Sequence, residues 1–202
     1  MTKLGITGQI ATGKSTAARE FAKFGGKIIF ADEIGREVVE GRPPILSKLV
    51  RAFGPQIVTP QGILKRRELG RMAFSCRENI ETLNRIVHPP LLQRLKEELE
   101  LCAADPQCPM AIIDAALLID WGWHKKMDWT VCVTASHESQ VKRLREKGLS
   151  DEEIQVRIAI QKSQQELASA CDFVIENDDT IEKLRAKVDA VYKKIISQSP
   201  SH

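Results

Sequence analysis

The segment GQIATGKST, residues 8–16, constrains the fold of this chain more than any other. A short apolar run, residues 3–7, precedes it, and a stretch with helical spacing follows from Lys14. The segment satisfies Gly-x-x-x-x-Gly-Lys-Ser, in which glycines let backbone N–H groups approach phosphate oxygens and the helix directs its positive end at the same anion. A chance match in an ordinary loop would lack this strand–loop–helix context. The segment therefore predicts a phosphate-binding loop.

The residue types of the loop predict individual contacts with a bound nucleotide. Lys14 is expected to reach the β- and γ-phosphates, and the Ser15 hydroxyl is the expected Mg²⁺ ligand. Thr16 can cap the helix or touch the α-phosphate. The residues expected to bind the nucleotide are Gly8, Ala11, Thr12, Gly13, Lys14, Ser15 and Thr16.

The rest of the chain has the pattern of an α/β protein. Apolar runs of strand length alternate with stretches of helical periodicity, which favours a parallel sheet covered on both faces. Within the helical stretch 79–104, Pro89-Pro90 is expected to break or kink the helix. The expected strands are residues 3–7, 27–31, 110–114, 129–134 and 172–176, and further expected helices are 14–24 and 45–53.

The spacing of the expected strands predicts two helical excursions from the sheet. The second and third strands are much further apart than one crossover helix requires, and the fourth and fifth are separated by a stretch rich in Arg, Lys and Glu. We therefore expect one domain with three parts. These are a core of about residues 1–40, 108–135 and 168–202, a helical insertion of about 41–107, and a candidate lid of about 136–167.

Composition limits the classes of partner. The formal net charge is only +3 and aromatic residues make up 5%, with no basic run interleaved with aromatics, so nucleic acid is not an expected partner. The five cysteines include no C-x-x-C pair and the four histidines complete no zinc spacing, which favours reduced thiols. The longest mostly apolar stretch, 110–123, is too short for a membrane span. We expect a cytoplasmic protein with small-molecule partners and no membrane contact.

Phosphate loops serve several classes of protein, and the sequence narrows the choice. A guanine-specific switch normally carries Asn-Lys-x-Asp, which does not occur here, and a large mechanical ATPase needs more than 202 residues. A kinase needs an acceptor site, a group that receives the acceptor's proton, and a cover that excludes water.

Asp32 is the candidate proton acceptor. It lies at the carboxyl end of the second expected strand, where open α/β sheets bind ligands. An N-cap for a helix over 33–39 explains the same residue equally well. Asp114, at the end of the third expected strand, also has two interpretations, a carboxylate that holds Mg²⁺ through water or an N-cap.

The cations of the second excursion supply the candidate cover. Residues 140–147, with Arg157 and Lys162, can close over a triphosphate and stabilise charge in the transition state. A solvated helix face explains most of these side chains better. We take Arg143, and after it Arg157, as the functional residues.

These residues, with several shorter motifs, resemble those of dephospho-coenzyme A kinases from Leu4 to about Leu184. The family's loop usually reads Gly-Gly-Ile-Gly-Ser-Gly-Lys-Ser-Thr, and its Asp-Ala-Asp element followed by a helical Arg matches residues 30–32 and Arg36. Apart from the loop no single motif is specific, but their order and spacing are. The other matching segments are 53–54, 62–69, 83–89, 114 with 117–118, 140 with 143–144, 157 with 161, and 172–177.

The resemblance implies a fold, a reaction and a set of site residues. The fold is α/β, a P-loop kinase with a five-stranded parallel sheet in a nucleoside-kinase-like, three-layer αβα arrangement. The reaction is the ATP- and Mg²⁺-dependent phosphorylation of the ribose 3′-hydroxyl of dephospho-coenzyme A, the last step of coenzyme A synthesis. For His88, a structural role beside Pro89 is at least as well supported as ligand contact. The implied catalytic residues are Asp32 as proton acceptor, Lys14 and Arg143, and the implied acceptor-binding residues are Asp32, Arg36, Arg66 and His88.

Three departures from the family pattern stand out. Gln9 and Ala11 replace loop glycines, Phe30 replaces the first Asp of the Asp-Ala-Asp element, and Ala116 and Asp120 stand where the family usually has Pro and Glu. None of them alters the residues expected to carry out phosphoryl transfer.

Two other functions fit the same loop. One is a kinase for another nucleoside or nucleotide acceptor, which would differ in the helical insertion. The other is a nucleotide-dependent binding module whose slow ATP hydrolysis does not respond to any acceptor.

Overall fold

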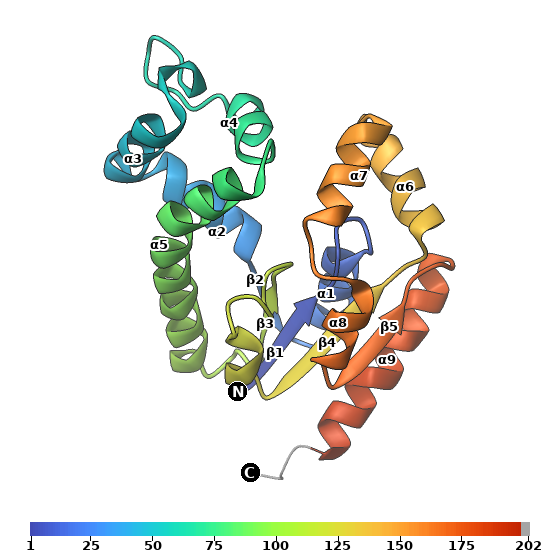
Figure 1. Cartoon of the computed structure of the whole chain (residues 1–202). Helices are drawn as coiled ribbons and strands as arrows, with labels where there is room; N and C mark the ends of the chain where they lie inside the picture. The colour runs from blue at the N-terminus through green and yellow to red at the C-terminus, as the bar shows by residue number, and fades with distance from the viewer. Residues whose placement is uncertain (199–202) are drawn as a thin grey trace. The chain divides into compact units, whose positions relative to one another are not determined.

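The computed structural model describes residues 1–198 and places all five expected strands in one sheet. The strand order is β2-β3-β1-β4-β5 and every neighbouring pair is parallel, as predicted (Figure 1). Residues 199–202, which the sequence analysis included in the core, lie outside the described residues. The strands are β1 (Thr2–Thr7), β2 (Lys27–Phe30), β3 (Met110–Asp114), β4 (Trp129–Thr134) and β5 (Phe173–Glu176).

Helices connect the strands and form both excursions. The helices of the first excursion are α2 (Ala31–Glu40), α3 (Pro43–Phe53), η1 (Pro55–Ile57), α4 (Arg66–Ala73) and α5 (Arg77–Ala104). The others are α1 (Lys14–Ala22), η2 (Trp123–Lys126), α6 (His137–Arg145), α7 (Asp151–Ala159), α8 (Gln164–Ser169) and α9 (Ile181–Gln198).

The chain packs as two compact units. Among the described residues, the first comprises 1–30 and 99–198, and the second comprises Ala31–Glu98. The helical unit thus begins at residue 31 rather than at the expected 41, because α2 buries an apolar face that packs with α3. It also ends before the expected residue 107, since the last turns of α5 pack with the first unit. The functional division into core, insertion and lid stays a prediction.

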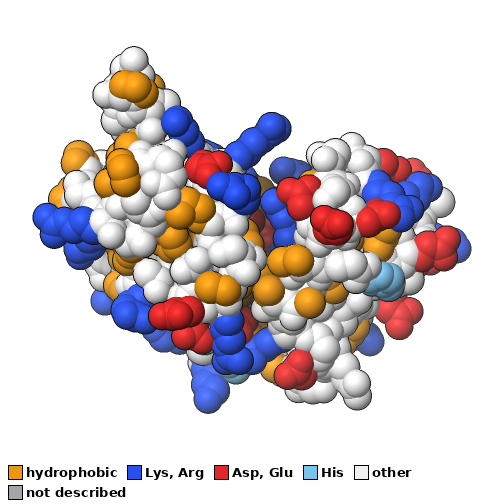
Figure 2. All heavy atoms as spheres, turned by 45° about the horizontal axis from the view of Figure 1, so that its top comes forward, with side chains coloured by type: hydrophobic (Ala, Val, Ile, Leu, Met, Phe, Trp, Pro, Cys, Tyr) orange, Lys and Arg blue, Asp and Glu red, His pale blue; other side chains and the backbone are white. Residues whose placement is uncertain are grey.

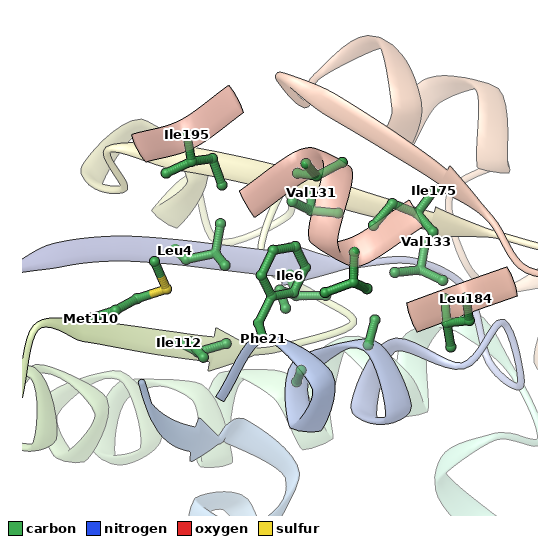
Figure 3. Close-up of a cluster of buried hydrophobic side chains, with 14 residues drawn as sticks. Leu4, Ile6, Phe21, Met110, Ile112, Val131, Val133, Ile175, Leu184 and Ile195 are labelled. Carbon is green, nitrogen blue, oxygen red and sulfur yellow. The ribbon is translucent and has the colours of Figure 1, made fainter. Parts of the chain in front are cut away.

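The core of the first unit lies between the sheet and helices α1 and α9. Leu4 and Ile6 of β1 are fully buried and point to the same side, because alternate residues of a strand face the same way. Phe21 of α1 packs into this cluster, and Leu184 of α9 joins it (Figure 3). Burying a side chain of this size contributes about 1.5–3 kcal/mol. The cluster therefore holds the strand and the helix on either side of the phosphate loop in place.

The second unit is helical, and its longest element is α5. The break considered at Pro89-Pro90 does not occur, since α5 is continuous from Arg77 to Ala104. The prolines remove two backbone donors, but Leu91 and Leu95 beyond them are buried and anchor the following turns. Within residues 1–198, no helix combines the length and low charge that crossing a membrane requires.

Candidate active site

The phosphate loop joins β1 to α1 and depends on two glycines with positive φ. Gly13 is the N-cap of α1 with φ 97°, and Gly8 has φ 147°. A Cβ on Gly8 would lie 2.2 Å from the carbonyl oxygen of Val133, so only glycine allows the loop backbone to pass this close to β4. Ala11 has φ 61° and is the one non-glycine residue with positive φ among residues 1–198.

Arg143 and Asn177 hold the loop in this conformation. Arg143 Nη1 donates to the carbonyl of Ala11 at 3.0 Å, and Nη2 donates to the carbonyl of Asn177 at 2.6 Å. The Asn177 side chain donates to the carbonyl of Thr12 at 2.7 Å. The guanidinium expected to stabilise the transferring phosphoryl group is thus bonded to backbone carbonyls. The catalytic role of Arg143 stays a prediction. Its observed contacts stabilise the conformation of the loop.

Ser15 and Asp114 form the centre of the candidate metal site. The Ser15 hydroxyl, in the first turn of α1, donates to Oδ2 of the buried Asp114 at the end of β3. Turns rather than a helix follow Asp114, so its interpretation as an N-cap is wrong. A hydroxyl and a carboxylate are hard oxygen donors, and Mg²⁺ in phosphate-transfer sites takes one or two such protein ligands. The pair fits the expected ion.

Lys14 lies at the same helix terminus. Among residues 1–198, its ammonium group has no hydrogen-bond or ion-pair partner. A cation at the N-terminus of a helix is opposed by the macrodipole, which favours anions there. A polyphosphate in the loop would stabilise this placement, and contact with the phosphates is what the sequence predicts for Lys14.

A cavity of about 380 Å³ opens beside the loop. Ala11, Gly13 and Thr16 form its loop side, while Ile181 and Leu184 of α9 supply an apolar surface. Pockets of this size with an apolar wall and a few polar groups suit small molecules, and here the wall would suit a planar base. The polar and charged lining residues are Arg143, Glu146, Lys147, Asn177 and Asp179.

The site residues expected from the sequence did not include Asn177, Asp179 or Ile181. The position of two of them in the sequence could have indicated a binding role. Asn177 and Asp179 follow β5 at its carboxyl end, where open α/β sheets bind ligands. The connection also bonds to the segment expected to form the lid, residues 136–167, which we call the lid segment. The Asp178 carboxylate accepts hydrogen bonds from the backbone N–H and the hydroxyl of Ser136, at 2.8 and 2.7 Å. Hydrogen bonds from the Ser139 and Ser136 hydroxyls lower the pKa of Asp178.

The residues expected to bind the acceptor all lie in the second unit. Asp32 is the second residue of α2 and is exposed, so its interpretation as an N-cap is wrong. Within the described chain its carboxylate has no hydrogen-bond or ion-pair partner, and exposed Arg36 lies one turn further along α2. Arg66 begins α4 and donates from Nε to the Glu40 carboxylate at 2.8 Å, which links α4 to the end of α2. His88 is half-buried within α5.

Phe30, which replaces a family aspartate, has a contact of its own. The guanidinium of Arg19 lies 5.5 Å from the centroid of its ring, a cation–π contact between α1 and β2. Charged side chains elsewhere are mixed in sign. Figure 2 shows Lys and Arg side chains lying among Asp and Glu side chains over this face rather than forming one basic stripe.

Comparison with known proteins identifies the family of this chain. The family model described as Dephospho-CoA kinase matches residues 2–183. A dephospho-CoA kinase of Corynebacterium glutamicum is 39% identical over 199 residues, covering 96% of this chain and 100% of the relative. A dephospho-CoA kinase of Thermobifida fusca is 35% identical over 196 residues, covering 96% of each chain.

Solved structures confirm the expected P-loop kinase fold. The crystal structure of TT1252 from Thermus thermophilus aligns with a TM-score of 0.78 and 31% identity, covering 96% of this chain and 97% of that one. Dephospho-CoA kinase from Campylobacter jejuni aligns with the same coverage, a TM-score of 0.63 and 21% identity. Shikimate kinase from Acinetobacter baumannii, with a TM-score of 0.56 and 16% identity over 100% of this chain and 96% of that one, shares the fold alone. The chain belongs to the dephospho-CoA kinase family.

Proposed function

We propose that the protein transfers the γ-phosphoryl group of ATP to the ribose 3′-hydroxyl of dephospho-CoA, producing CoA and ADP. The observation that carries the proposal is the Ser15–Asp114 pair at the start of α1, set in a family-matched phosphate loop. Loop, hydroxyl and carboxylate together supply the parts that phosphoryl transfer needs for its donor.

The residues of the first unit would bind and orient the donor. Backbone N–H groups of the loop and the Lys14 ammonium would receive the phosphate oxygens and stabilise the charge that develops on them. The cavity beside Ile181 and Leu184 would hold the base. Arg143 would act by fixing the carbonyls of Ala11 and Asn177, and hence the direction of the loop.

The second unit would supply the acceptor site. The unpartnered Asp32 carboxylate would accept the proton of the 3′-hydroxyl as that oxygen forms its bond to phosphorus and the bond to the ADP oxygen breaks. Arg36, Arg66 and His88 are the proposed acceptor contacts. Arg66 would be oriented through its hydrogen bond to Glu40.

Mg²⁺ is part of the proposal. Ser15 and Asp114 would hold the ion, Asp114 directly or through water, and the ion would neutralise charge on the phosphate oxygens. A cytoplasmic location is also proposed. Its support is that no disulfide joins the five cysteines, all of which lie within residues 1–198, and that three of them are buried.

The decisive experiment replaces Asp32. Asp32→Asn keeps the size and removes the base, so kcat for ADP formation with dephospho-CoA should fall about 10²–10⁴-fold, as for loss of a general base. Glu33→Gln, an exposed carboxylate next to it on α2, is the matched control and should retain wild-type kcat. Near-normal turnover of Asp32→Asn would remove Asp32 from this role.

A panel of acceptors separates the other functions. Greater activity with a different nucleoside or nucleotide than with dephospho-CoA would indicate another kinase specificity. ATP hydrolysis that no acceptor changes would indicate a binding module. Either result would overturn the proposed reaction.

A further inference from the structure

Gln9 is a buried polar side chain inside the phosphate loop. It is 6% exposed, and its Nε2 donates to the carbonyl of Lys162 at 2.9 Å. Its Oε1 accepts from Nε2 of Gln140 at 3.3 Å. Gln140 lies on α6, and Lys162 lies in the connection between α7 and α8. Gln9 therefore contacts both arms of the lid segment. The outgoing arm is α6, which follows β4, and the returning arm is the α7–α8 connection, which leads back toward β5.

The next loop residue is held by the same two arms. The backbone N–H of Ile10 donates to Oε1 of Gln161 at 2.7 Å, and its carbonyl accepts from Nε2 of Gln140 at 2.8 Å. Both backbone groups of Ile10 thus bond to side-chain amides of the lid segment. The two bonds can form together only when the loop and both arms are correctly placed.

The amide network continues to the sheet. Gln164 Nε2 donates to Oε1 of Gln140 at 3.2 Å. The Gln164 amide also bonds to the N–H and the carbonyl of Ala135, just after β4, at 2.8 and 2.7 Å. All of these side chains are neutral, so the network joins the loop to the lid segment without placing a negative charge beside a triphosphate. Buried, mutually satisfied amides of this kind rigidify the groups they connect.

We propose that Gln9 is a positioning residue that orders the phosphate loop and couples it to the lid segment before ATP binds. The inference rests on the proposed function in taking ATP as the nucleotide. A glycine at this position has no side chain to bridge to Lys162 or Gln140, so such a loop would lose more conformational freedom on binding. A preorganised loop incurs that cost during folding, and the nucleotide binds more tightly.

The test compares Gln9→Leu and Gln9→Gly with the wild type. Gln9→Leu keeps most of the volume and removes both hydrogen bonds, whereas Gln9→Gly restores a loop glycine and cannot clash. Loss of interactions made equally in ground and transition states raises KM and leaves kcat unchanged. We expect the KM for ATP to rise about five- to tenfold, the value for one or two hydrogen bonds. The kcat and the KM for dephospho-CoA should stay within about twofold of wild type. Gln165→Leu, at an exposed position of α8, is the control.

A second readout does not depend on the reaction. Without nucleotide, hydrogen exchange at Ile10 and at residues 160–164 should accelerate together in both Gln9 variants, and direct titration should show weaker ATP binding. If exchange and ATP affinity match wild type, or if only kcat falls in proportion to lost folded protein, the proposal is wrong. If the wild-type enzyme does not phosphorylate dephospho-CoA, the proposed function is wrong. Hydrogen exchange and ATP titration would still decide the role of Gln9.

Discussion

Replacing Gly13 with alanine tests the structural account of the phosphate loop directly. Gly13 caps α1 with φ 97° and ψ 19°, and a Cβ built there lies 2.1 Å from Nδ2 of Asn177. That nitrogen cannot simply move away, because it donates to the buried Thr12 carbonyl at 2.7 Å. The variant therefore acquires backbone strain and also displaces Asn177 from a buried hydrogen bond.

The expected loss of unfolding free energy in Gly13→Ala follows from these two effects. A left-handed conformation costs a non-glycine residue about 1–2 kcal/mol. Leaving a buried acceptor unsatisfied costs about 1–3 kcal/mol. Gly13→Ala should thus lower the free energy of unfolding by about 2–5 kcal/mol. Gly148→Ala is the matched control, since Gly148 has φ 81° with nothing within 4 Å of its built Cβ, and it should lose only the strain component.

Urea denaturation of the nucleotide-free variants measures both losses. Asn177→Ala completes a double-mutant cycle, because it removes the side chain that the methyl group introduced by Gly13→Ala would strike. The double variant should then be more stable than the sum of the single effects by about 1–2 kcal/mol. Additive losses, or equal stability of Gly13→Ala and Gly148→Ala, would refute the proposed clash.

Two further predictions concern titratable groups of the first unit. A hydrogen bond from Lys23 lowers the pKa of buried Glu20 below its ordinary 4.5, so this stabilisation is present above pH 4.5 and is lost as the pH falls through the lowered folded-state pKa. Since Lys23 is largely exposed, Glu20→Gln should cost about 1 kcal/mol at pH 7, and denaturation curves of the two proteins should converge in acid. Contact with Cys171 and burial raise the pKa of the Cys132 thiol, so Cys132 stays protonated at pH 8. Iodoacetamide should therefore modify exposed Cys76 at least about tenfold faster than Cys132, as peptide mapping would reveal, and comparable rates would contradict this.

The local sequence pattern was sufficient to predict most of the helices and strands. Each strand contains a short apolar run, and the central strands β3, β1 and β4 are buried along most of their length. The second helical unit was visible as an excess of chain between two strands, but its boundaries were not. α2 follows the strand directly, and only its burial against α3 assigns it to the helical unit. Pro89-Pro90 carried a local signal for a break that packing of Leu91 and Leu95 overrides.

The sequence alone determined the phosphate loop, because the residues expected to bind the phosphates follow one another between one strand and the first turn of one helix. It also predicted that Asp114 ends a strand and that Asp32 lies close to the carboxyl end of another. Only the tertiary structure decided what Arg143 and Gln9 contact. Arg143 bonds to Ala11 across 132 positions of the chain and Gln9 to Lys162 across 153, and no local periodicity encodes a hydrogen bond between residues so far apart. Such contacts exist only after the sheet has brought the loop, α6 and the α7–α8 connection together.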